Sequence, residues 1–179
     1  MKRISGLIAI GLLAALSLPP AATAHVLTVQ PVKAVVLPAD ESGLTRVALQ
    51  FDFSGMRSGE GRQIHRALLD WKVSGVPSDR HSEYALYPIT EAWTTAGAAA
   101  GTRVSTAADA TASWDFEALD YQRNGGGFIR LDVTDLVRDW VGGEESNYGF
   151  VVTTADVSRQ AIADQLSKAE LTVRYGFIR

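Results

Sequence analysis

The chain has 179 residues, with 17 basic and 20 acidic side chains, a net charge of −3 and no cysteine. This length suits a single domain of ordinary size, and the lack of cysteine excludes disulfides, thiol catalysis and a lipid anchor attached to cysteine. The mildly acidic balance, without a cluster of Lys and Arg, argues against a nucleic-acid or anionic-membrane partner.

The first residues have the composition of a secretory signal peptide. A basic start at residues 2–3 precedes an apolar run at 4–18, and residues 22–24 form a small-x-small cleavage motif. The run is short for a membrane span, and no later segment offers about 18 uninterrupted apolar residues, so no span is predicted. We expect cleavage after Ala24, a mature chain that begins at His25, and a secreted or periplasmic protein.

Apolar and polar residues alternate along much of the remaining chain, which is the pattern of half-buried strands. The clearest examples are LTRVALQFDF, ALLDWKV and ELTVRYGF. Their predicted inward residues are Val47, Leu49, Phe51 and Phe53; Ala67, Leu69, Trp71 and Val73; and Leu171, Val173, Tyr175 and Phe177. Further strands are predicted at residues 26–37, 84–89, 128–132 and 148–154.

Short alternating segments, separated by clusters of Gly, Ser, Asp and Pro, predict an all-β fold. The expected architecture is an antiparallel two-sheet β-sandwich of the jelly-roll type. Residues 96–112 are rich in Ala, Gly and Thr and lack a period, so we expect a long surface loop there. The sequence contains no visible repeat or linker, and residues 25–179 are predicted to form one domain.

The period changes after the strand predicted at 128–132. Apolar residues then form one stripe of a short helix over residues 133–141, which would cap the end of the sandwich. Asp132 is suited to be its N-cap, and Gly142 with Gly143 to provide a left-handed exit. Asn147 is expected to turn the chain into the next strand.

The segment LDVTDLVRDWVGGEESNYGF resembles the C-terminal hallmark of the DNRLRE domain family. Its motif positions here are Asp132, Trp140, Asn147 and Gly149. RVALQFDFSGM followed by IHRALLDWKV, and later YPITEAWTT, are similar to earlier motifs of that family, so the resemblance covers roughly residues 44–177. The mostly apolar opening HVLTVQPVKAVVLPADESG departs from the family's Asp-rich opening.

The resemblance implies a β-sandwich with a non-catalytic role, because the DNRLRE family is related to a family of polysaccharide-binding (alginate-binding) modules described on alginate-degrading proteins. That role would be glycan binding, adhesion or structure at a cell surface or in an extracellular matrix. The resemblance implies no catalytic residue for this chain.

Trp114, Tyr121 and Arg123 are the candidate ligand-binding residues. They lie near one another in an unpatterned region, and exposed aromatic rings beside planar donors can stack on and hydrogen-bond sugars. The alternative is that Trp114 closes a loop against the edge of a sheet. The other tryptophans are predicted to be core residues: Trp71, Trp93 and Trp140.

The histidines provide an enzymatic alternative. As the mature N-terminus, His25 would offer an amine and an imidazole, and with His65 or His81 it can bind Cu(II) in a square plane, as in copper-dependent polysaccharide oxygenases. A further alternative is protein–protein adhesion or assembly through exposed sheet edges. The oligomeric state is left open.

No cofactor is predicted. The acidic residues around the predicted helix are Asp132, Asp135, Asp139, Glu144 and Glu145. They could share a calcium ion with backbone carbonyls, but the D-x-D-x-D-G spacing is missing, and capping and solvation explain them. Motifs for a nucleophile elbow, a phosphate loop or a zinc protease are also missing from the sequence, so no catalytic residue is assigned.

Overall fold

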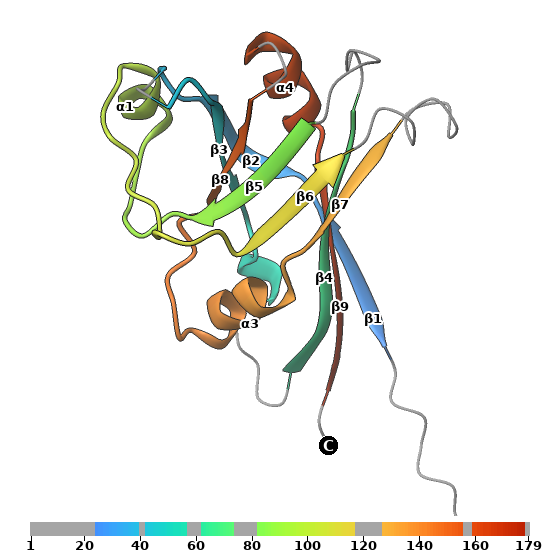
Figure 1. The fold of residues 1–179 in the computed structure, drawn as a ribbon. Coiled ribbons are helices and arrows are strands. Elements are labelled where there is room, and N and C mark those ends of the chain that lie inside the picture. The colour runs from blue at the N-terminus through green and yellow to red at the C-terminus, as the bar shows by residue number, and fades with distance from the viewer. Residues whose placement is uncertain are drawn as a thin grey trace, which may run out of the picture.

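The computed structural model describes residues 24–39, 42–56, 62–73, 82–116, 127–155 and 159–177, and within them two antiparallel sheets lie face to face (Figure 1). The four-stranded sheet has the spatial order β1 (His25–Val29), β9 (Glu170–Phe177), β4 (Arg62–Lys72) and β7 (Phe128–Asp132). The five-stranded sheet has the order β2 (Pro31–Val36), β3 (Thr45–Phe51), β8 (Phe150–Thr154), β5 (Ser82–Pro88) and β6 (Ala112–Phe116).

The strand order is that of a jelly roll. With β2 set aside as an added edge strand, the chain passes repeatedly from one sheet to the other, so that neighbours within a sheet come from distant parts of the sequence. Thus β9 pairs with both β1 and β4, and β8 pairs with both β3 and β5. The predicted all-β, antiparallel, jelly-roll-like sandwich is confirmed.

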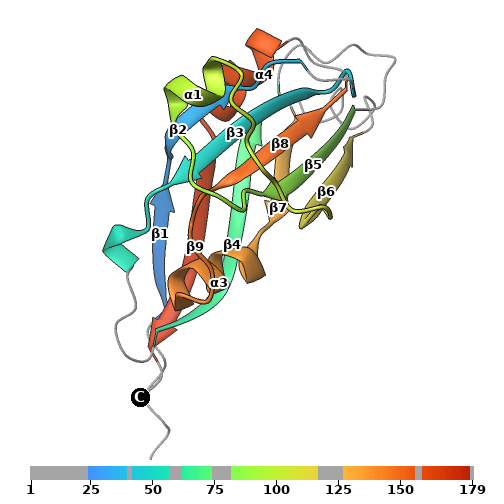
Figure 2. The same ribbon diagram turned by 90° about the vertical axis from the view of Figure 1, so that its left-hand side faces the viewer.

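The predicted inward faces form the core between the two sheets. The apolar faces of β3 and β4 are buried, including Leu49, Leu69 and Trp71. Phe177 is different: it has the parity of the buried Leu171 but remains 46% exposed. The reason is that β9, together with β4 and β1, extends beyond the end of the five-stranded sheet (Figures 1 and 2).

The strand predicted at residues 26–37 is two strands in two different sheets. β1 pairs with β9 in one sheet, whereas β2 pairs with β3 in the other. The change of sheet occurs at Pro31, which has no N–H to donate, and the register of β2 shifts between Pro31 and Lys33. Bends of this kind allow a strand to form a corner of a sandwich.

Two helices close the ends of the sandwich. α3 (Thr134–Gly142) lies at one end, where the capping helix was predicted, and α4 (Arg159–Leu166), which was not predicted, lies at the other (Figures 1 and 2). Both direct apolar side chains into the main core, Trp140 from α3 and Ile162 from α4 among them. No helix in the described ranges is both long and apolar enough to cross a membrane.

The ends of α3 follow the prediction in part. The cap position belongs to Val133, which makes no side-chain cap bond, and not to Asp132. The Asp132 carboxylate nevertheless accepts a hydrogen bond from the Thr134 N–H at 3.0 Å, so it satisfies one of the helix's first donors. The predicted left-handed exit is confirmed at Gly143, with φ 81°.

The long surface loop predicted at residues 96–112 is a structured cover. It contains most of α1 (Thr95–Ala99) and crosses the outer face of the five-stranded sheet (Figure 2). There Ala98 and Val104 pack in a second small core with Ala48 and Val151. Because this core covers its outer side, β8 is buried on both faces.

Candidate functional site

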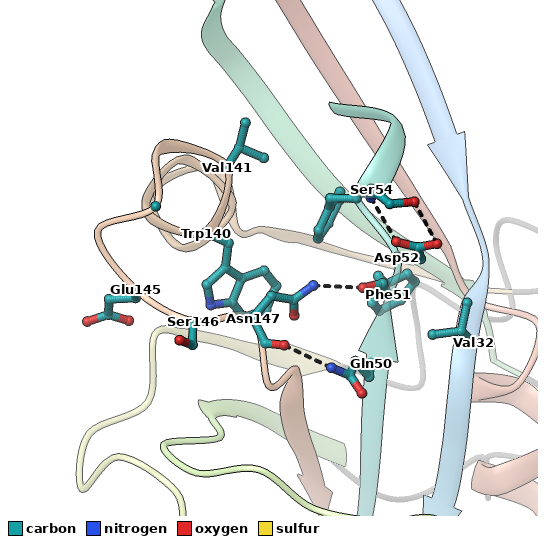
Figure 3. A pocket seen from close by; sticks show the side chains of 12 residues that line it. Val32, Gln50, Phe51, Asp52, Ser54, Trp140, Val141, Glu145, Ser146 and Asn147 are labelled. Carbon is teal, nitrogen blue, oxygen red and sulfur yellow. Dashed lines mark hydrogen bonds between the residues drawn. The ribbon is translucent and has the colours of Figure 1, made fainter. Parts of the chain in front are cut away.

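A cleft of about 650 Å³ lies beside the C-terminal end of α3 (Figure 3). One wall is the end of α3 with the turn that follows it, and the other is the end of β3 with the 3-10 helix η1 (Ser54–Met56). The lining residues that bear on chemistry are Gln50, Asp52, Ser54, Trp140, Glu145 and Asn147.

Trp140 forms the aromatic part of the cleft. Its indole stacks on Phe150 with ring centroids 6.2 Å apart and an interplanar angle of 7°, and lies 6.0 Å from the ring of Phe53. Only 8% of the residue is exposed, which agrees with its prediction as a core residue. The cleft is therefore lined by part of a rigidly packed indole and not by a freely exposed ring.

Asn147 joins the two walls. Its Nδ2 donates to the backbone carbonyl of Phe51 at 2.7 Å, and its backbone carbonyl accepts from Gln50 Nε2 at 2.8 Å (Figure 3). Its Oδ1 accepts from the Gly149 N–H at 3.1 Å, which fixes the turn into β8. These bonds hold the turn after α3 against the end of β3, so the cleft has a preformed shape.

Gly149 allows the close approach that these bonds need. Its φ is +87°, and a Cβ built on it would lie 1.9 Å from the Leu49 carbonyl oxygen and 3.0 Å from Gln50 Cα. No residue with a side chain fits at that distance. This explains a glycine at a motif position in terms of backbone packing beside the cleft.

The rim of the cleft is acidic and rich in hydrogen-bonding groups. Asp52 accepts from the Ser54 N–H at 2.7 Å and from the Ser54 hydroxyl at 3.0 Å, and Glu145 is exposed on the facing turn. Asp52 and Glu145 are the charged residues among the described lining, which includes no Lys, Arg or His. The arrangement suits a neutral ligand with many hydroxyl groups and disfavours an anionic one.

The other acidic residues of the predicted cluster do not converge. Asp132 Oδ2 lies 3.6 Å from Arg66 Nε, whereas Asp135 pairs with Arg138, so these two carboxylates pair with different arginines. Partial burial alone would raise the pKa of Asp132, but hydrogen bonds from Thr134 and the charge of Arg66 lower it below its ordinary value. Among the described residues, no three His, Cys, Asp or Glu side chains are grouped to hold a metal ion.

The candidate glycan-binding residues are only partly within the described chain. Trp114 lies in β6, where its backbone pairs with Tyr84. Tyr121 and Arg123 lie outside the described residues. A site that combines these three residues therefore stays a prediction.

The histidines of the copper alternative lie on different faces of one sheet. His25 stacks on Tyr175, with centroids 5.3 Å apart, on the inward face of the four-stranded sheet. The His65 ring lies over the outward side of Gly176, where a Cβ would meet its Nε2 at 2.7 Å. His81 lies outside the described residues. Within the described part of the chain, His25 and His65 do not share a site.

Trp140 and Asn147 lie at motif positions that the sequence predicts, whereas the facing wall of the cleft is not predicted. Gln50 and Asp52 lie on the polar face of the strand predicted there, and Asp52 and Ser54 lie within the family-like segment RVALQFDFSGM, but none of the three is predicted to line a site. The available signal was local: Asp52 followed by Ser54 at a strand end is typical of a side-chain turn. Nothing local in the sequence indicates that this strand end faces Asn147.

No protein-family model and no curated protein matches the chain. The likeness to the DNRLRE family therefore depends on its motifs alone.

Proposed function

We propose that this chain is an exported, non-enzymatic β-sandwich of the DNRLRE type that binds an uncharged stretch of polysaccharide in the cleft between α3 and the end of β3. The observation that carries the proposal is the convergence of amide, hydroxyl and carboxylate groups around a packed indole. Export is supported by the signal-peptide composition, with cleavage after Ala24. Binding to a polysaccharide would attach the domain to a cell surface or matrix.

The size and chemistry of the cleft support a sugar ligand. Small-molecule sites typically measure about 300–1,000 Å³ and combine an apolar surface with a few fixed polar groups. A volume of about 650 Å³ lies within that range. Sugar hydroxyls both donate and accept hydrogen bonds, so they can pair with the carboxylate of Glu145 and with the amide of Gln50.

A binding role is supported over hydrolysis. Glycosidases need two facing carboxyl groups, one of which is buried enough for its pKa to rise so that it can act as an acid. Asp52 and Glu145 are both exposed, and the Asp52 carboxylate already accepts two hydrogen bonds from Ser54. Among the described lining residues, the cleft therefore offers acceptors for hydroxyl groups without a buried catalytic acid.

The test is a titration of the mature protein with neutral polysaccharides, such as dextran, xylan and galactomannan, and with polygalacturonate as an acidic one. Binding is measured by calorimetry and by affinity electrophoresis. We expect Glu145→Ala to weaken binding by about tenfold or more, because a hydrogen bond to a charged group contributes about 1.5–3 kcal/mol.

Glu144→Ala is the matched control. Glu144 is exposed and adjacent in sequence, but it does not line the cleft. Equal losses in the two variants, binding to the acidic polysaccharide alone, or no binding to any neutral polysaccharide would contradict the proposal. Release of reducing sugar by the wild-type protein would contradict its non-enzymatic part.

A further inference from the structure

A group of aromatic side chains lies on the overhang, the part of β1, β9 and β4 that extends beyond the end of the five-stranded sheet (Figures 1 and 2). The inward face of the overhang carries His25, Tyr175, Phe177 and Arg62. His25 pairs with Tyr175 and Arg62 pairs with Phe177 on neighbouring strands, so the four side chains share this face. None of them is among the described residues that line the cleft.

The rings of the overhang are packed against one another. His25 stacks on Tyr175 with ring centroids 5.3 Å apart and meets Phe177 edge to face, also at 5.3 Å. The rings of Tyr175 and Phe177 lie 6.2 Å apart. The Arg62 guanidinium lies 5.8 Å from the centroid of Tyr175 and 5.6 Å from that of Phe177. Ring–ring and cation–ring contacts of this kind hold aromatic side chains in fixed orientations.

The overhang nevertheless leaves aromatic surface open to solvent. Phe177 is 46% exposed, and His25 and Tyr175 are half-buried. Within the described part of the chain, the Tyr175 hydroxyl and the His25 ring nitrogens make no hydrogen bond or ion pair. The overhang therefore combines an apolar ring surface with polar groups at its border, which is the combination that sites for small polar ligands use.

The overhang adjoins the cleft through η1. Ser54, the first residue of η1, lines the cleft, and the carbonyl of the next residue, Gly55, accepts a hydrogen bond from Arg62 Nη1 at 3.3 Å. The same guanidinium lies over Phe177. Two consecutive residues of one short element and one arginine side chain therefore connect the cleft wall with the exposed ring.

We propose that the overhang is a second subsite for the neutral polysaccharide of the cleft, in which a sugar unit packs on Phe177 and hydrogen-bonds to Tyr175. This inference rests on the proposed function. The exposed surface is one phenyl ring with two half-buried neighbours, which suits a single sugar unit. It is far smaller than the roughly 1,200 Å² that stable protein–protein interfaces bury, so a sugar is favoured over a second copy of the chain.

The test compares each neutral polysaccharide with its own disaccharide on the mature protein: dextran with isomaltose, xylan with xylobiose, and galactomannan with mannobiose. We expect Phe177→Ala to weaken binding of the polysaccharide about threefold to tenfold, as expected for loss of an aromatic contact. Binding of the disaccharide in the cleft should not change. Phe128→Ala is the matched control, because Phe128 is 67% exposed but lies on β7, at the opposite edge of the four-stranded sheet from β1, and it should change neither affinity.

Phe177→Leu covers the case in which the alanine variant unfolds. It keeps an apolar side chain but loses the ring face, so it should also weaken polysaccharide binding while its urea midpoint stays that of the wild type. In the labelled wild-type protein, the polysaccharide should shift the His25 imidazole signals together with the Trp140 indole signal.

The outcomes separate the subsite from the cleft. A saturable Trp140 shift with an unchanged polysaccharide affinity in both Phe177 variants would overturn the subsite and leave the cleft. The absence of any Trp140 shift would contradict the proposed function itself. Imidazole signals that move with protein concentration in the absence of sugar would overturn the subsite in favour of a second copy of the chain.

Discussion

Replacement of Gly149 by alanine should destabilise the protein far more than the same change at Gly143. Both residues have a positive φ, +87° and +81°, which costs an alanine about 1–2 kcal/mol. Their surroundings differ. A Cβ at Gly149 would lie 1.9 Å from the Leu49 carbonyl oxygen, whereas nothing lies within 4 Å of a Cβ at Gly143.

The overlap at Gly149 involves backbone atoms, so no side chain can rotate away to relieve it. β3 and β8 would have to separate where Leu49 pairs with Phe150, and overpacking of this kind typically costs about 1–3 kcal/mol. The expected loss is about 2–5 kcal/mol for Gly149→Ala and about 1–2 kcal/mol for Gly143→Ala. The first is a large part of the roughly 5–15 kcal/mol that stabilises a typical domain.

Urea denaturation followed by tryptophan fluorescence measures both losses. With an m-value of about 2 kcal/mol/M, the midpoint should fall by about 1–2.5 M for Gly149→Ala and by about 0.5–1 M for Gly143→Ala. Equal falls in the two variants would refute the close approach of Gly149 to β3, and with it the explanation of how the cleft is shaped.

Three further substitutions test other contacts. Asn147→Asp places an oxygen where Nδ2 donates to the Phe51 carbonyl, and we expect a loss of about 1–3 kcal/mol in urea denaturation; an unchanged midpoint would contradict this bond. Asp132→Asn should be less stable than the wild type at pH 7. The difference in free energy of unfolding should shrink as the pH falls below the ordinary carboxyl pKa of 3.8, because the interactions that lower the pKa of Asp132 stabilise only its ionised form. A difference that stays constant with pH would contradict these interactions. Trp93→Phe loses the hydrogen bond from Nε1 to the Tyr148 carbonyl, so thermal unfolding should show a free energy of unfolding lower by about 1 kcal/mol. An unchanged free energy of unfolding would contradict this bond.

The alternation of apolar residues predicted most of the strands because β3, β4 and β9 each bury one face against the other sheet. The alternation does not reveal where the chain changes direction within a continuously apolar segment. Across Pro31 the sequence stays apolar while the chain changes sheets, so one strand was predicted in place of two. Ala98 and Val104 are too small and too few to show a period, although both are buried in the second small core.

Only one wall of the candidate cleft can be predicted from the sequence. Trp140 and Asn147 lie in a recognisable motif, and the helix between two strands was predicted from periodicity. Gln50 belongs to the cleft because its side chain bonds to the Asn147 carbonyl, 97 positions away in the chain. That contact depends on the pairing of β3 with β8, which local patterns do not specify.

Tryptophan indole resonances provide the most direct test of polysaccharide binding in the cleft. The chain has 4 tryptophans, and their indole N–H signals can be assigned in the 15N-labelled mature protein with single Trp→Phe variants. During titration with a neutral polysaccharide, we predict a saturable shift of the Trp140 indole signal together with the amides of Glu145 and Asn147, weakened by Glu145→Ala and unaffected by Glu144→Ala. A shift at Trp114 without one at Trp140, or no saturable shift, would contradict binding in this cleft.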